Sequence, residues 1–238
     1  MKIAICFFGV LHGFAGRDYD IKHCWPNLSR MIVQPFVEKH TKASPVIPIR
    51  KEHQVEILLS TYKVTDEFLE KEIYDMIKPD HVQISDIQNS SSKTTKLALF
   101  KLLENKDYDF VIMTRTDLHF SEELIDKIDY DKFNFLFRES GHRKLNLTCD
   151  NFYAWPYKFT EQVKKSFETC PKLNTHDTHK LFDTLSKNIP VESIHYIAGE
   201  EEYYSDVNKY FTICKRFSNS RLEHGLHEEV MERFNIKK

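Results

Sequence analysis

Apolar residues in the first half of the chain form short continuous runs, which alternate with stretches where apolar residues recur every three or four positions. Continuous apolar runs of strand length are typical of strands buried on both faces of a parallel sheet, whereas the three-to-four spacing predicts helices. The expected strands are 2–8, 55–63, 81–86 and 109–114. The expected helices are 25–39, 65–77 with Thr65 as a cap, and 93–105. This alternation predicts an α/β fold with a central, mostly parallel sheet flanked by helices.

The pattern changes after residue 120, where strands and helices no longer alternate regularly. Two further strands are expected at 134–140 and 149–156, followed by helices at 158–169 and 176–187. No internal repeat and no Pro/Gly-rich linker divides the chain. We therefore expect a single domain over residues 1–238.

The charges nearly balance, because 34 Lys and Arg residues face 36 Asp and Glu residues without a polybasic run. A nucleic-acid-binding protein is therefore not expected. No 18 consecutive apolar residues occur, so no transmembrane segment is expected either. The five cysteines are odd in number and lack a CxxC pair, which favours a reducing compartment and a cytoplasmic protein. The opening run could instead be a signal peptide, but its short length and single preceding lysine favour a strand.

Three of the six glycines fall closely together after the first expected strand, at Gly9, Gly13 and Gly16. Such clustering indicates unusual backbone dihedrals or a close approach to another group. The spacing of four and three differs from GxGxxG. It therefore argues against a Rossmann-like methyl- or nucleotidyltransferase, which remains an alternative enzyme class.

Polar residues follow the ends of the expected strands. In open α/β sheets, ligands bind beyond the carboxyl ends of the strands, because loops and helix amino termini converge there. The polar groups expected at this edge are the loop 9–17, residues 60–62, the serines at 90–92, and Arg115, Asp117 and His119. The sequence therefore predicts a ligand site at this edge.

Asp117 and His119 are two residues apart, so in an extended chain their side chains point to the same side. Together they could bind one divalent ion, with Mn²⁺ or Mg²⁺ suiting a carboxylate and imidazole pair. Alternatively, Asp117 caps the following turn and His119 is a surface residue. Arg115 could anchor a neighbouring carboxylate or reach a phosphate group.

Five segments follow one another along the chain: KIAICFFG, VEILLSTYK with IKPDHVQISD, a helix that begins with polar residues, YDFVIMTRTDLHF and DNFYAWP. Their order resembles that in nucleotide-sugar-dependent glycosyltransferases of the GT-A fold. The likeness covers roughly residues 1–160 and is greatest to small bacterial and large-virus sugar transferases. It implies a nucleotide-sugar donor and a glycan, lipid-linked or protein acceptor. It also implies a nucleotide-binding half at 1–120 and an acceptor-side half at 121–238.

That family usually carries an Asp-x-Asp motif at the end of the matching strand, where its carboxylates hold a divalent ion on the donor diphosphate and touch the ribose. The matching positions here are Asp117, Leu118 and His119. A histidine replaces the second carboxylate, which weakens the expectation of strict metal dependence and favours Mn²⁺ over Mg²⁺. Because of this replacement, a non-catalytic sugar-nucleotide-binding module remains an alternative function.

The resemblance also implies which residues contact the donor. The candidate donor-binding residues are Phe8, Gly9, Arg17, Thr61, Tyr62, Arg115 and His176. Phe8, Gly9 and Arg17 would face the base and phosphates, and Thr61 and Tyr62 would flank the base or ribose. Each of these residues could instead be an ordinary loop residue that contacts no ligand.

Asp150 is, with Asp117, the candidate catalytic residue. In an inverting transferase it would act as the general base on the acceptor hydroxyl, and in a retaining one it would position the sugar. It could equally be a turn residue. Tyr153 and Trp155 could offer a face for sugar stacking, although aromatic residues in a strand more often belong to the core.

Residues 174–182 form the densest polar cluster of the chain. His176 and His179 with Asp177 could bind a metal, or the cluster could be a helix start capped by Asn174 or Thr175. His176 or Asp177 could also lie near the donor diphosphate.

Overall fold

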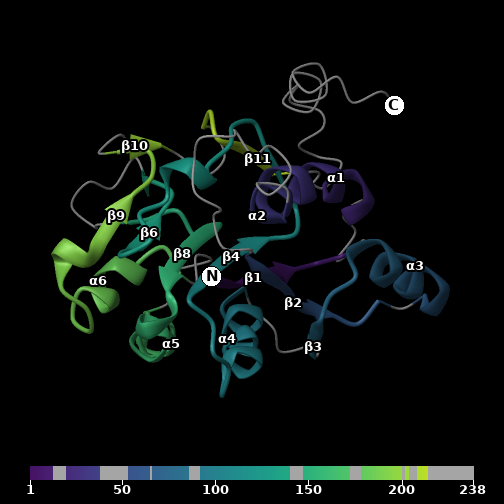
Figure 1. Ribbon diagram of the computed structural model, residues 1–238, viewed down its shortest axis with the longest axis horizontal. Coiled ribbons are helices and arrows are strands. Elements are labelled where there is room, and N and C mark those ends of the chain that lie inside the picture. The colour runs from purple at the N-terminus through teal and green to yellow at the C-terminus, as the bar shows by residue number, and fades with distance from the viewer. Residues whose placement is uncertain are drawn as a thin grey trace, which may run out of the picture.

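The computed structural model places seven strands in one sheet (Figure 1). It describes residues 1–12, 20–37, 53–64, 66–85, 92–139, 147–171, 178–199, 202–203 and 208–213. The strands are β1 (Lys2–Gly9), β2 (Gln54–Tyr62), β3 (His81–Ser85), β4 (Phe110–Arg115), β6 (Phe133–Phe135), β8 (Phe152–Pro156) and β9 (Ile194–Tyr196). Their order is β3-β2-β1-β4-β8-β6-β9, and β8 alone runs antiparallel to both of its neighbours. The expected α/β fold with a mostly parallel sheet is confirmed.

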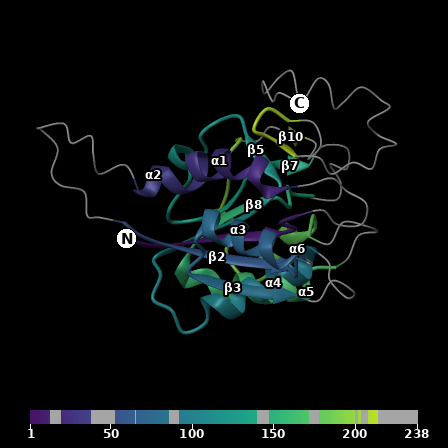
Figure 2. The same ribbon diagram turned by 90° about the vertical axis from the view of Figure 1, so that its right-hand side faces the viewer.

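Helices cover both faces of this sheet. The helices are α1 (Trp25–Leu28), α2 (Gln34–Val37), α3 (Glu67–Ile77), α4 (Ser92–Leu103), α5 (Thr160–Thr169) and α6 (Leu181–Leu185). A π-helical segment, Ser29–Val33, joins α1 to α2. Helices α1 and α2 lie on one side of the strands, and α4 and α5 lie on the other (Figure 2). None of the helices within the described ranges is long and apolar enough to cross a bilayer.

Strand β1 is buried on both faces, as its continuous apolar run predicts. Ile3, Ile5 and Phe7 join the core cluster that contains residues of α1, α2 and α3. Ala4, Cys6 and Phe8 join the second cluster, which contains residues of α4, α5 and α6. Because successive side chains of a strand point to opposite faces, one apolar run supplies both cores.

Two small sheets extend the second half of the chain. Strand β5 (Leu118–Phe120) pairs with β11 (Phe211–Ile213), and β7 (Arg138–Glu139) pairs with β10 (Glu202–Tyr203). The side chain of Asn27 in α1 holds β5, since its Nδ2 donates to the Phe120 carbonyl at 2.9 Å and its Oδ1 accepts from the Phe120 amide at 2.7 Å. Strands β5, β10 and β11 were not predicted, because two or three residues show no detectable periodicity. Strand β7 lies within the strand expected at 134–140, which the structure divides into β6 and β7.

Two predicted helix starts need correction. Asp66 caps α3 by accepting from the amides of Phe68 and Leu69 at 3.0 and 3.1 Å. Thr65, the predicted cap, lies outside the described residues. Helix α6 begins at Leu181 rather than at 176, because the carbonyl of His179 accepts from the amide of Thr148 at 2.8 Å and this tertiary contact holds residues 178–180 in a non-helical turn.

The sheet has a topological switch point between β1 and β4. Strands β2 and β3 lie on one side of β1, and β4 lies on the other, so the loops after β1 and β4 leave the sheet in opposite directions. Gly9 lies at this point with a φ of +124°, and a Cβ atom added there would be 3.1 Å from the Oγ1 of Thr116. Thr116 in turn donates from its amide to the Phe8 carbonyl and from its hydroxyl to the Val10 carbonyl, at 3.1 and 2.7 Å. The glycine thus allows two strand ends to meet.

We expect Gly9→Ala to destabilise the protein by about 1–3 kcal/mol, because alanine is strained at this φ and its methyl group crowds Thr116. Gly199→Ala is the matched control, since Gly199 has a φ of +74° and nothing within 4 Å of an added Cβ. Gly199→Ala should lower the free energy of unfolding only by the cost of backbone strain, about 1 kcal/mol. Urea denaturation measures both variants, and equal losses would contradict the close approach at Gly9.

Candidate functional site

Four side chains form a row across neighbouring strands at the carboxyl edge of the sheet. Ser60, Phe8 and Arg115 are register partners in β2, β1 and β4. The amide of Arg115 donates to the carbonyl of Asn151 at 3.3 Å, which continues the row to the start of β8. Side chains in register point to the same face, and Phe8 belongs to the core cluster on the α4 side. The row therefore faces α4.

Arg115 anchors Asp117 through two hydrogen bonds. Its Nε donates to Oδ1 at 2.7 Å and its Nη2 to Oδ2 at 2.5 Å, while Nη1 donates to the side-chain oxygen of Asn151 at 2.9 Å. Both members of the pair are buried. A bidentate pair of this kind fixes the plane of the carboxylate. The expectation that Arg115 anchors a neighbouring carboxylate is confirmed, and Asp117 is held by Arg115 rather than serving only as a turn cap.

The argument that placed Asp117 and His119 on one side of an extended chain is wrong. Strand β4 ends at Arg115, a turn occupies residues 116–117, and β5 begins at Leu118, so the alternation of side chains is interrupted. His119 is half-buried, and burial together with the charge of Arg30 lowers the pKa of its imidazole. The neutral imidazole favoured in this way is the form that binds metals.

The donor set at the edge fits a divalent ion only in part. No cluster of three or more His, Cys, Asp or Glu side chains suited to a metal occurs among the described residues. A carboxylate has about four acceptor sites, and Arg115 occupies two of those on Asp117. Asp117 and His119 are thus chemically suitable ligands, and binding of a metal by them stays a prediction.

Lys96 is a functional candidate that sequence reasoning missed. Its side chain is 0% exposed, yet it is charged and belongs to the second turn of α4. Its Nζ donates to the Asp150 carbonyl at 2.8 Å, to the Thr178 hydroxyl at 2.5 Å and to the Tyr153 hydroxyl at 3.4 Å. It also lies 4.8 Å from the ring centroid of Phe8. Lys96 therefore lies next to the row of strand ends.

The side chain of Asp150 lies between two basic groups. Its Oδ2 is 3.8 Å from Lys96 Nζ, and its Oδ1 is 3.5 Å from His179 Nε2. The other ring nitrogen of His179 lies 3.7 Å from a carboxylate oxygen of Glu139. Burial and the neighbouring Glu139 and Asp150 carboxylates raise the pKa of the Cys149 thiol well above its usual range. Asp150 thus belongs to a network of charged side chains and is more than a turn residue.

Two buried polar atoms in the row have no hydrogen-bond partner among the described residues. They are the Oγ of Ser60 and the Nδ2 of Asn151. Buried polar groups are nearly always hydrogen-bonded, and an exception calls for an explanation such as a catalytic role or a bound water or ion. Their position on either side of Phe8 and Arg115 therefore supports a ligand site here.

The remaining predicted site residues differ in how the structure places them. Thr61 and Tyr62 lie at the end of β2 and are buried, and Gly9 is the register partner of Thr61. Thr61 has the parity of Gly9, so it does not share the face of Phe8. Arg17, His176 and Asp177 lie outside the described residues. His179 precedes α6 rather than lying within the helix expected at 176–187.

Tyr153 and Trp155 belong to the core. Both are fully buried, and the Trp155 ring stacks on Phe133 and Phe100 with centroid distances of 5.8 and 6.0 Å. Tyr153 packs edge-on against Phe167. The sugar-stacking interpretation of these two residues is therefore wrong.

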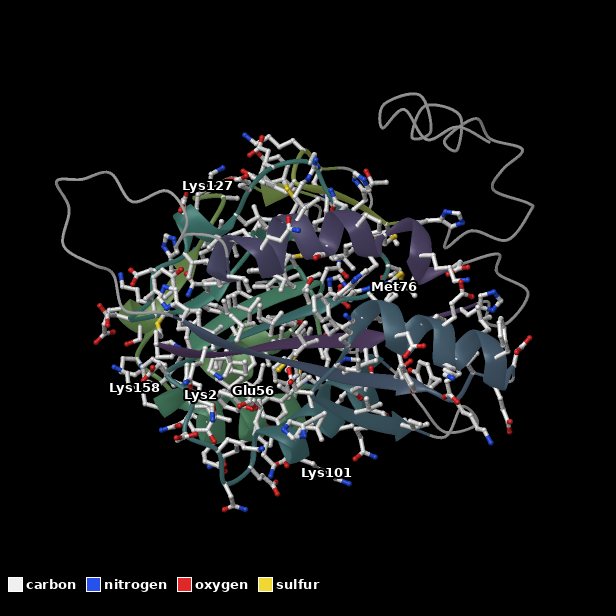
Figure 3. All side chains as sticks on the ribbon, turned by 45° about the vertical axis from the view of Figure 1, so that its right-hand side comes forward. Lys2, Glu56, Met76, Lys101, Lys127 and Lys158 are labelled. Atoms are coloured by element: carbon white, nitrogen blue, oxygen red, sulfur yellow. The ribbon has the colours of Figure 1, made fainter. Side chains whose placement is uncertain are left out.

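A second group of charges lies at the opposite edge of the sheet. Lys2 and Glu56 lie beside each other there (Figure 3), with Lys2 Nζ 3.2 Å from Glu56 Oε1 and 2.6 Å from Asp107 Oδ1. The hydroxyl of Tyr108 donates to Glu56, and this bond is the main reason that the pKa of Glu56 is lowered. These pairs are partly exposed and at the amino ends of the strands, so we assign them a structural role.

No family model matches the chain. No curated protein matches it significantly. Functional inference therefore depends on the order of sequence segments, the topology of the sheet and the geometry of the carboxyl edge.

Proposed function

We propose that the chain is a nucleotide-sugar-dependent glycosyltransferase of the GT-A fold, which transfers a sugar from a nucleotide diphosphate to an acceptor hydroxyl. The observation that supports this most strongly is the buried Arg115–Asp117 pair at the topological switch point, where Thr116, the residue between them, contacts Gly9. Open α/β sheets bind nucleotides at such points. The resemblance over residues 1–160 supplies the sugar-transfer chemistry.

Each residue of the edge has a proposed part in binding. Gly9 lets the ends of β1 and β4 meet, which places Arg115 and Asp117 at the switch point. Asp117, oriented by Arg115, and His119 would hold a divalent ion, which when bound stabilises negative charge on the diphosphate. Arg115 adds positive charge at the same place. Asp150 accepts a hydrogen bond from a hydroxyl of the bound sugars.

The reaction breaks the bond between the anomeric carbon and a phosphate oxygen, so that nucleoside diphosphate leaves, and forms a bond from that carbon to the acceptor oxygen. The proton of the acceptor hydroxyl passes to Asp150 in an inverting reaction and to the departing diphosphate in a retaining one. Fixed charges accelerate such a step when they are oriented before the substrate binds. The two hydrogen bonds of the bidentate Arg115–Asp117 pair orient Asp117, and the basic groups facing both oxygens of Asp150 orient that carboxylate.

A thermal-shift screen against UDP-, GDP- and dTDP-sugars, with and without Mn²⁺, tests the proposal. A donor present at 100 times its Kd should raise the free energy of unfolding by about 2.7 kcal/mol. Mn²⁺ should enhance the shift and EDTA should reduce it. Asp117→Asn should remove it, whereas Asp131→Asn, at an exposed acidic residue, should not.

The enzyme assay follows from the nucleotide that binds. Release of nucleoside diphosphate from the donor, by transfer or slow hydrolysis, would support the proposal. Binding without any release would support a non-catalytic sugar-nucleotide-binding module. Stabilisation by S-adenosylmethionine alone would contradict sugar transfer and favour a methyltransferase.

A further inference from the structure

We infer that Lys96 is a positioning residue that holds Asp150, and through the adjacent Asn151 also Arg115, in the arrangement that the site needs. The catalytic part of this inference rests on the proposed function. Its structural part, that Lys96 fixes the segment entering β8, stands independently of the reaction.

Lys96 joins three segments that are far apart in the sequence. Its ammonium group donates to the main-chain carbonyl of Asp150 and to the hydroxyls of Tyr153 and Thr178, so it connects α4, β8 and the turn before α6. A bond to the main chain fixes the path of the backbone as well as a side chain. The Asp150–Asn151 segment is consequently held from two sides, by Lys96 at Asp150 and by Arg115 at the side chain of Asn151.

The surroundings of Lys96 explain how a buried cation is tolerated. An ammonium group removed from water is unfavourable unless hydrogen bonds and an opposite charge replace the lost hydration. Here three oxygen acceptors surround Nζ, the Asp150 carboxylate lies 3.8 Å away, and the rings of Phe8 and Tyr153 lie 4.8 and 5.3 Å away. Such a residue is difficult to replace without releasing the groups that it holds.

Burial also determines which role Lys96 can have. Because its side chain is 0% exposed, it contacts the protein and acts through other residues. Asp150 keeps 13% of its side chain exposed, so the carboxylate is accessible while its two oxygens face Lys96 and His179. Lys96 therefore sets the direction of a carboxylate that a bound hydroxyl can reach.

The first test measures the position of the segment without any substrate. Lys96→Met retains the aliphatic length and removes the charge, and Lys101→Met is the matched control, because Lys101 is exposed on the same helix (Figure 3). Native-state alkylation, resolved by mass spectrometry, reports the opening of each buried cysteine. We expect Cys149, adjacent to Asp150, to react at least about tenfold faster in Lys96→Met, with Cys6 and Cys24 unchanged.

Two results would overturn the structural part. An equal rise at Cys149, Cys6 and Cys24 would show that Lys96 only stabilises the whole fold. An unchanged rate at Cys149 would show that the segment does not need it. If Lys96→Met does not fold, Thr178→Val removes one acceptor of the ammonium group and should give a smaller rise, again confined to Cys149.

The second test measures catalysis with the donor that binds. In Lys96→Met, kcat should fall at least about tenfold while the Kd of the nucleoside diphosphate changes less than about twofold, because Lys96 acts through Asp150 and not on the phosphates. Lys96→Met and Asp150→Asn should be non-additive in kcat. Additive effects, or a loss of nucleotide affinity equal to the loss of kcat, would overturn the positioning role.

The two tests separate this inference from the proposed function. If the wild-type protein neither binds nor turns over any nucleotide sugar, the proposed function fails, and the alkylation pattern still decides whether Lys96 fixes the segment. If the wild-type protein is active and Lys96→Met retains full kcat, the proposed function stands and the inference fails.

Discussion

Replacing Asp117 by alanine is expected to abolish binding of the nucleotide sugar and to lower the free energy of unfolding by about 3–5 kcal/mol. The stability loss arises because Arg115 is buried and keeps its charge after the carboxylate is removed. The loss of binding arises because the proposed metal and diphosphate contacts depend on the oriented carboxylate. Urea denaturation and calorimetric titration with the donor and Mn²⁺ measure the two effects separately.

A double variant distinguishes structural loss from functional loss at this site. Arg115→Met together with Asp117→Leu replaces the buried ion pair by apolar side chains, an exchange that is often neutral for stability. It should recover most of the stability of the wild type and none of its donor affinity. Full donor affinity in either the single or the double variant would contradict the assignment of Asp117 to the donor site.

Strands β1 and β4 were predictable from sequence, because both are buried on both faces and therefore carry continuous apolar runs. Residues 3–8 form a continuous apolar run and lie within β1, in the middle of the sheet. Strand β9 was missed, since three residues of mixed polarity such as Ile194–Tyr196 carry no pattern of their own. Pairing with β6 makes this segment a strand, and pairing is a tertiary property.

The parts of the candidate site also differ in how far the sequence predicts them. Arg115 and Asp117 are two residues apart, so their proximity could be predicted locally. Lys96 and Asp150 are separated by 54 positions, and only the tertiary fold brings them together. One signal was present in the sequence, because Lys96 falls on the helical stripe of Phe100 and Leu103, which is the buried face of α4.

The orientation of β8 explains why residues before this strand belong to the site. Because β8 runs antiparallel to β4, its first residue lies near the carboxyl end of β4, and Phe152 pairs with Thr114. A parallel strand would have placed Asp150 and Asn151 at the opposite edge. The candidate role of Asp150 therefore depends on a strand direction that the apolar pattern of residues 149–156 does not reveal.

Replacing Trp155 by alanine is expected to lower the free energy of unfolding by about 3–5 kcal/mol, because a fully buried indole is removed from between Phe100 and Phe133. Trp155→Phe keeps an aromatic ring in the stack and loses the hydrogen bond from Nε1 to the Thr160 hydroxyl, 3.2 Å long, so its loss should be smaller. Urea denaturation measures both variants.

The phenylalanine variant also tests whether Trp155 has any contact with the donor. If Trp155 is purely a core residue, folded Trp155→Phe protein should retain the wild-type ratio between the Kd of the nucleotide sugar and the Kd of the nucleoside diphosphate alone. A ring that stacked on the sugar would change this ratio, since only the sugar-bearing ligand would lose the contact. A changed ratio without a change in stability would contradict the assignment of Trp155 to the core.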